Sequence, residues 1–267
     1  MTKIIILTAL LVSFICFSQD SIPYRDIITI NKNKIVNEVL FPVKKTISTD
    51  SLIINKQVLN FNKDLFLKDS FLINRYKFHA FGYKPDRYLY QWNCPINIYF
   101  DKLIPKNIIN DFTDYINGFN SIPNLKISIT TNIEDANYYF KVYEADISAY
   151  SKEVLNSLNN EESKTKLYTK ITYDLNQNKN KKYYNGILKI SKSELSNKYL
   201  SSKLKIIFYL SLTHFYRSDK AEKNSILNKE TILVDELSDY DIILLKSHYN
   251  QIYPVKINYK NFINLLK

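Results

Sequence analysis

From residue 90 onward, hydrophobic and polar positions follow the short periods of strands and helices. Pro95–Asp101 alternates apolar and polar side chains, which predicts a half-buried strand. Pro105 can occupy the first turn of a helix, and apolar positions between Ile108 and Phe119 recur at helical spacing, so a helix is predicted there. The same reasoning predicts four further strands, at Leu125–Thr131, Ala136–Tyr143, Leu167–Leu175 and Asn185–Ser191.

The longest helical pattern follows the last of these strands. Leu200, Leu204 and Phe208 recur every four residues, which predicts a helix from about Asn197 to Tyr216 with an apolar face. Further helices are predicted at Ile147–Leu158, at Asp239–Tyr249 behind the N-cap candidate Ser238, and at Tyr259–Leu266.

The N-terminal part of the chain has no clear period. Residues 20–75 contain short apolar runs, and residues 19–85 are therefore interpreted as an arm or accessory region that packs onto a domain at residues 86–267. The order of strand, helix, strands, long helix and C-terminal helices predicts an α+β fold, with helices packed against a mixed sheet.

The first 18 residues have the pattern of a cleavable export signal. Lys3 precedes an apolar run from Ile4 to Phe17 of roughly 14 residues, too short to span a bilayer as an anchor. Cleavage after Ser18 would secrete the mature chain or release it into a periplasm. Lipid anchoring at Cys16 is disfavoured because the large Ile15 precedes it. No other run reaches the roughly 20 apolar residues of a transmembrane helix.

Composition limits the chemistry open to the mature chain. The formal net charge is +11, and +10 once Lys3 is removed with the signal. Only three glycines are present, which excludes glycine-rich phosphate loops and strained nucleophile turns.

Cys94 is the one cysteine left after cleavage, so no intrachain disulfide forms, and we expect its thiol to be buried and inert. The basic tract Lys179–Tyr184 is interpreted as a solvated loop rather than a specific nucleic-acid site.

Five residues of the long helix, Leu210–His214, fit the frame of a zinc-peptidase motif incompletely. A His-Glu-x-x-His sequence places two metal ligands on one helical face, with the glutamate as general base. His214 occupies the second histidine position, whereas Leu210 and Ser211 stand where the first histidine and the glutamate would be. No catalytic residue is therefore assigned, and His79 is expected to be structural.

Short motifs around this helix resemble those of a family of uncharacterised exported bacterial proteins with a zincin-like domain. They are Leu212-Thr213-His214, Ser225-Ile226-Leu227, Leu237–Asp241 running to His248-Tyr249, Trp92–Phe100 and Ala136-Asn137-Tyr138. The resemblance covers roughly residues 90–255. It implies a metallopeptidase-like mixed sheet whose edge-like strand, Gly186–Ser191, leads into the long active-site helix. The family's helix glutamate is absent here, so the resemblance implies a degenerate catalytic helix.

Three functions remain open from the sequence. The first is a non-catalytic exported protein that binds a protein or glycan, or acts as an envelope scaffold. The second is a metal-dependent hydrolase, with zinc as its cofactor, at a site built from His214, His248 and either Asp219 or Asp241. The third is a basic protein that binds anionic polymers, in which Lys179, Lys181 and Lys182 cluster with other lysines.

Overall fold

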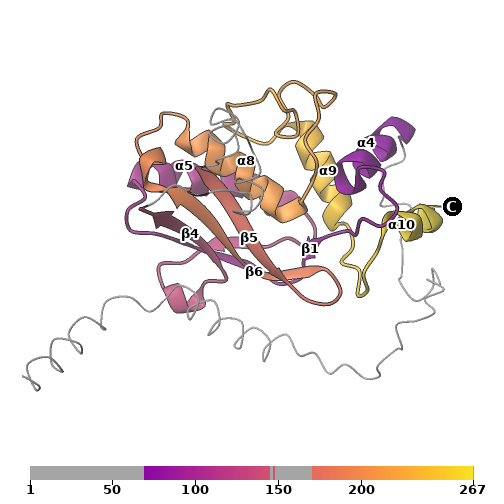
Figure 1. Ribbon diagram of the computed structural model, residues 1–267, viewed down its shortest axis with the longest axis horizontal. Helices are drawn as coiled ribbons and strands as arrows, with labels where there is room; N and C mark the ends of the chain where they lie inside the picture. The colour runs from indigo at the N-terminus through magenta and orange to yellow at the C-terminus, as the bar shows by residue number, and fades with distance from the viewer. Residues whose placement is uncertain (1–68, 145–146, 148–169, 267) are drawn as a thin grey trace, which may run out of the picture. The chain divides into compact units, whose positions relative to one another are not determined.

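The computed structural model describes residues 69–144, 147 and 170–266, and within them six strands form one mixed sheet (Figure 1). The strands run in the order β1-β6-β4-β2-β3, and these neighbours are parallel, while β5 pairs with β6 in the antiparallel direction. Their bounds are β1 Gln91–Trp92, β2 Ile96–Phe100, β3 Ile127–Ile129, β4 Tyr138–Tyr143, β5 Ile171–Gln177 and β6 Lys182–Ser191. The expected α+β class with a mixed sheet is therefore confirmed.

β6 lies in the interior of the sheet. It pairs with β4 from Gly186 to Ser191 and with β5 on its other side. The expectation that Gly186–Ser191 is an edge strand is wrong, because β5 folds back along it as a hairpin. Side chains alternate across each strand, so Phe140 and Leu188 share the face that packs on helices.

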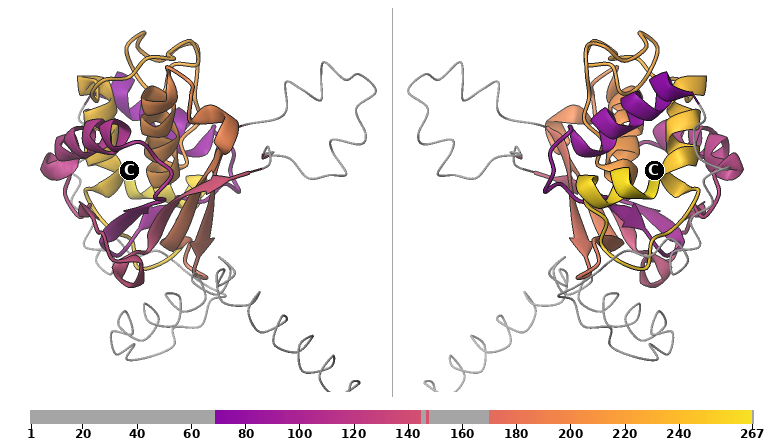
Figure 2. Two further views of the ribbon diagram at one scale, coloured as in Figure 1. Left: turned by 90° about the vertical axis from the view of Figure 1, so that its left-hand side faces the viewer. Right: turned by 90° about the vertical axis from the view of Figure 1, so that its right-hand side faces the viewer.

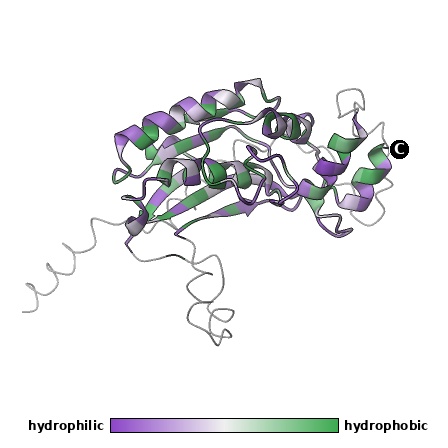
Figure 3. Cartoon of the chain, turned by 90° about the horizontal axis from the view of Figure 1, so that it is seen from above, coloured by the Kyte–Doolittle hydropathy of each residue, from purple (hydrophilic) through white to green (hydrophobic). Residues whose placement is uncertain are grey.

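Five α-helices accompany the sheet in the described residues: α4 Ser70–Phe81, α5 Lys106–Asn117, α8 Leu200–Thr213, α9 Asp239–Tyr249 and α10 Tyr259–Leu266. The last two match their predicted bounds, and the side chain of Ser238 caps α9 as predicted. Figure 2 shows α5 and α8 over one face of the sheet, and Figure 3 shows the hydrophobic and hydrophilic bands of the elements.

Four of the sequence-based predictions lie outside the described residues. They are the export signal, the Cys16 site, the apolar runs of the arm and the helix at 147–158.

α4 was not anticipated from the sequence. Asp69 caps its first turn, and Gly82 ends it in the left-handed conformation at φ 59°, with a ring atom of Tyr216 only 2.6 Å from where a Cβ would stand. Tyr76 and Phe81 of α4 are buried in the same core as the sheet and the C-terminal helices. The described fold thus begins inside the region interpreted as an arm.

α8 is buried on nearly all sides. It is shorter than predicted and ends at Thr213, because His214 adopts the left-handed conformation at φ 54°. Phe208 has no exposed surface, and its ring lies 5.2 Å from that of Phe112 and 5.4 Å from that of Tyr138. Aromatic rings at these distances add favourable edge-to-face contacts to the burial of apolar area.

Truncating Phe208 should therefore destabilise the whole fold. We expect Phe208→Ala to lower the free energy of unfolding by about 3–5 kcal/mol, measured by urea unfolding followed by circular dichroism. The control Phe71→Ala removes an identical ring that is 56% exposed, and it should cost less than about 1 kcal/mol. Equal losses in the two variants would contradict the central position of α8.

Candidate functional site

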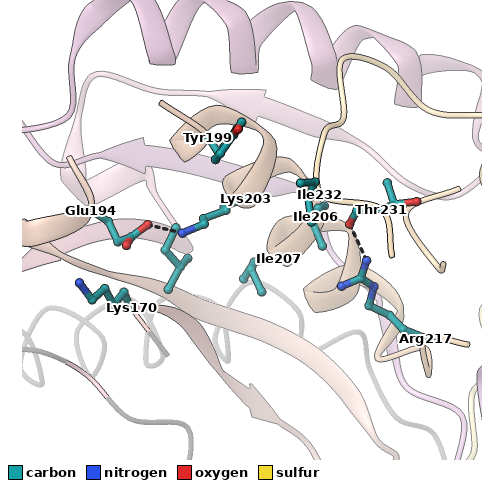
Figure 4. A pocket seen from close by; sticks show the side chains of 10 residues that line it. Lys170, Glu194, Tyr199, Lys203, Ile206, Ile207, Arg217, Thr231 and Ile232 are labelled. Atoms are coloured by element: carbon teal, nitrogen blue, oxygen red, sulfur yellow. Dashed lines mark hydrogen bonds and ion pairs between the residues drawn. The ribbon is translucent and has the colours of Figure 1, made fainter. Parts of the chain in front are cut away.

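A cavity of about 510 Å³ lies between the start of β5, α8 and the segment 217–232, called here the 217–232 loop (Figure 4). Its volume is within the range of small-molecule sites, roughly 300–1,000 Å³. Its apolar lining comes from Ile171, Ile206, Ile207 and Ile232. Its charged lining comes from Lys170, Glu194, Lys203 and Arg217. Tyr199 and Thr231 complete the wall.

The topology explains why these segments meet. β6 ends at Ser191, the 3₁₀ turn Lys192–Glu194 follows, and α8 begins at Leu200. β5 is antiparallel to β6, so its first residue, Ile171, lies opposite Ile190 at that same end of the sheet. The cavity is therefore at the carboxyl end of a parallel strand, where open α/β sheets hold their ligands.

Glu194 and Lys203 form an ion pair at one end of the cavity. Lys203 Nζ lies 2.7 Å from Glu194 Oε2, and Asn197 donates to the same carboxylate at 3.0 Å. The Glu194 side chain is only 5% exposed, whereas that of Lys203 is 40% exposed. The charge of Glu194 is thus neutralised by Lys203 of α8, and the pair leaves no unpaired negative charge in the cavity.

Arg217 stands at the other end of the cavity and holds the 217–232 loop (Figure 4). Its Nε donates to the carbonyl of Ile226 at 3.0 Å, and its Nη2 donates to the carbonyls of Asn228 and Thr231. Burial lowers the pKa of the guanidinium from its usual value. Since its partners in the described residues are carbonyls and not carboxylates, its positive charge is not compensated by an acid.

Asp241, a candidate metal ligand, is a structural anchor for this loop. Its carboxylate accepts hydrogen bonds from Ser225 Oγ at 2.5 Å, from the backbone N–H of Ile226 at 3.0 Å and from Ser238 Oγ at 2.7 Å. Burial raises the pKa of Asp241, although these hydrogen bonds act in the opposite direction. The side chain therefore ties the loop to the N-terminus of α9.

His248 and His79 have both ring nitrogens engaged. His248 Nε2 lies 2.7 Å from the carbonyl of Tyr90, and its Nδ1 lies 3.2 Å from the hydroxyl of Tyr76. His79 has the same arrangement, with the carbonyl of Tyr216 on one side and the hydroxyl of Tyr240 on the other. A carbonyl can only accept, so each ring donates there and accepts from the tyrosine as a neutral imidazole. The structural role expected for His79 agrees with this geometry.

His214, the residue that fits the zinc-peptidase frame, belongs to a third network. Its Nδ1 lies 3.2 Å from the hydroxyl of Tyr173, and its ring packs 5.1 Å from that of Tyr90. Its backbone carbonyl accepts from Arg87 at 2.6 Å. Burial and, to a smaller extent, the charge of Arg87 lower the pKa of His214 to about 4.

The proposed metal ligands are therefore not brought together. Among the residues that the structure describes, no group of three or more His, Cys, Asp or Glu side chains could hold a metal ion. Asp219, the alternative acid, lies on the surface near Lys229 at 3.8 Å. Ser211, at the glutamate position of the frame, is fully buried, accepts from the hydroxyl of Tyr138 at 2.8 Å and donates to the carbonyl of Phe208.

The lysines of the basic tract do not share one surface. Lys182 is 2% exposed and donates to Gln91 Oε1 at 2.9 Å, and burial lowers its pKa to about 7. Lys181 instead lies over the ring of Tyr88, as does Lys256. The expectation that Lys182 joins a cluster of surface lysines is wrong, because its side chain turns into the core.

Cys94 is less buried than expected. It is partly exposed, accepts a weak hydrogen bond from Asn137 and donates to the carbonyl of Tyr184. Burial raises the pKa of its thiol to about 11, so the reactive thiolate is scarce at neutral pH.

No protein-family model and no curated protein sequence matches this chain. Of the helices in the described ranges, none combines the length and apolarity needed to cross a membrane. The sequence alone does not predict the cavity, because Arg217 follows the long helix in a segment without hydrophobic periodicity. The signal that could have found it is the spacing of Lys203, Ile206 and Ile207, which lie three and four residues apart on one face of α8.

The three histidines should make the fold sensitive to acid. Burial lowers the pKa of His79 and His214 to about 4 and that of His248 to about 3, below the usual 6.5. Below pH 6.5 the unfolded chain binds protons that the folded chain does not. The free energy of unfolding therefore decreases as the pH is lowered, until the pKa of the folded state is reached. Between pH 6.5 and 5 we expect a loss on the order of 1 kcal/mol for each histidine, measured by urea unfolding.

A variant provides the control for this prediction. His79→Gln removes one of the three titrating rings. The free energy of unfolding that the variant loses between pH 6.5 and pH 5 should therefore be about a third smaller than the loss in the parent chain. Stability that does not change between these two pH values would show that the histidines titrate alike in the folded and unfolded states.

Proposed function

We propose that this chain is an exported binding protein with a zincin-like fold and without peptidase chemistry, and that its ligand occupies the cavity beside α8. The cavity carries the proposal, since isoleucine side chains lie between charged groups at its two ends (Figure 4). A concave site with few polar groups among apolar ones is typical of small-molecule recognition. Export rests on the pattern of residues 1–18.

Three features of the fold support the zincin-like part of the proposal. The sheet is mixed, with one antiparallel strand, β5, next to β6. β6 leads through the turn Lys192–Glu194 into the long helix α8, and two helices, α9 and α10, follow it. This order of elements corresponds to the one that the resemblance of the short motifs implies, although β6 is an interior strand and not the expected edge strand.

The surroundings of α8 support the non-catalytic part. Hydrolysis of the zincin type needs three metal ligands and a general base that reaches a water molecule. Leu210 and Ser211 have no such chemistry, and the described residues contain no group of three or more His, Cys, Asp or Glu side chains that could hold a metal ion. The polar atoms at this end of α8 hydrogen-bond to neighbouring side chains instead.

Isoleucine methyl signals test where a ligand binds. With ¹³C-labelled isoleucine methyl groups, small molecules that occupy the cavity should shift the signals of Ile171, Ile206, Ile207 and Ile232. Ile98, fully buried in β2, is the internal control and should not respond. A mixture of small acids, alcohols and amines with apolar groups is the first set to screen.

Two outcomes would contradict the proposal. Ligands that shift only signals remote from the cavity would place binding elsewhere on the chain. One equivalent of zinc, lost together with peptide hydrolysis in His214→Ala, would restore the hydrolase hypothesis. We expect no hydrolysis that depends on His214.

A further inference from the structure

We infer that the cavity binds a carboxylate at the end of an aliphatic chain, with the carboxylate at Arg217 and the chain along the isoleucines. This inference rests on the proposed function, because it names the ligand class of the same cavity. Arg217 and the Glu194–Lys203 pair stand at opposite ends, with Ile206, Ile207 and Ile232 between them (Figure 4).

The charges of the lining favour an anion. Three cationic side chains and one acidic side chain line the cavity. The acid, Glu194, is already paired with Lys203 at 2.7 Å. Lys170 and Arg217 are left without a carboxylate partner in the described residues, so an anionic group would meet uncompensated positive charge and a cationic group would be repelled.

The hydrogen bonds of Arg217 determine which of its donors are left for the anion. A guanidinium has five N–H donors, and the 217–232 loop uses the one on Nε and both on Nη2. The two donors on Nη1 make no hydrogen bond with the described part of the chain. Asn185 Nδ2 is the one buried side-chain polar atom found without a partner in these residues, so Nη1 is not shut away in the core. The side-on fork formed by Nε and Nη2, through which arginine holds carboxylate or phosphate by two parallel bonds, is therefore occupied, and Nη1 remains for an anionic oxygen.

The apolar part of the lining gives the ligand its second feature. Ile206 is buried, Ile207 is partly buried, and Ile232 on the loop is 61% exposed. A large apolar side chain exposed at a cavity gains stability when a ligand covers it. An aliphatic chain that runs from Arg217 across these three side chains would cover the exposed surface of Ile207 and Ile232, whereas a small anion alone would leave it in water.

Calorimetric titration of the full chain with four probes of equal chain length tests the ligand class. Octanoate should bind, while 1-octanol and octylammonium should bind at least about tenfold more weakly because they lack the anion. Octyl phosphate should not exceed octanoate, because a single nitrogen of Arg217 is available and the more highly charged phosphate costs more to remove from water. Raising the salt concentration should weaken octanoate binding more than octanol binding.

Two neighbouring positions provide a matched pair of variants. Ile232 and Leu233 are both 61% exposed, but only Ile232 lines the cavity. Ile232→Glu should weaken octanoate binding by at least about tenfold, and Leu233→Glu by less than about twofold. Ile232→Gln separates the lost apolar contact from the added charge, and it should weaken octanoate less than Ile232→Glu does.

The outcomes separate this inference from the proposed function. If octanol binds as tightly as octanoate, and Ile232→Glu does not discriminate between them, the inference is wrong while the cavity remains a binding site. If octyl phosphate binds more tightly than octanoate, the carboxylate assignment is wrong. If no probe binds, the inference fails, and the isoleucine methyl screen decides the proposed function independently.

Discussion

The burial of α8 between the sheet and the remaining helices is the constraint on which the other features depend. Phe208 packs on α5 and on β4, and Leu204 and Leu212 extend the same contact along the helix with no exposed surface. A helix buried this completely must satisfy its polar groups internally. Lys205 accordingly meets Asp111 Oδ1 at 2.9 Å, and Ser211 is hydrogen-bonded to Tyr138. Lys203 and Ile207 are among the residues of α8 that stay partly exposed, and the cavity forms beside them.

The wall opposite α8 depends on two buried charges. Residues 214–238 contain no helix or strand, so their backbone groups need other partners. Arg217 supplies three donors to loop carbonyls, and Asp241 accepts from one loop N–H and from two serines. A buried charge is stable only when such bonds replace its hydration. The shape of the cavity is therefore set by electrostatic anchors on this side and by aromatic packing on the other.

Local periodicity was sufficient to predict most of the regular elements, but not their long-range placement. α9 and α10 were predicted at their observed bounds because their caps and spacing are encoded locally. α4 was missed because its apolar side chains do not form a single stripe. The interior position of β6 depends on pairing with β5 across a turn, which periodicity cannot report. The cavity could not be predicted because its lining comes from segments around residues 170, 203 and 232.

The end of α8 explains why restoring the missing motif residues would not rebuild a zinc site. Two histidines four residues apart share a face only while both are helical. His214 lies beyond the last helical residue, and its left-handed conformation at φ 54° redirects the side chain relative to Leu210. Its Nδ1 already meets Tyr173, and its carbonyl is held by Arg87. Since a left-handed cap breaks the common face, histidine at 210 and glutamate at 211 would still lack the geometry of the frame. The end of α8 thus makes structural contacts, and the cavity lies along the side of the helix.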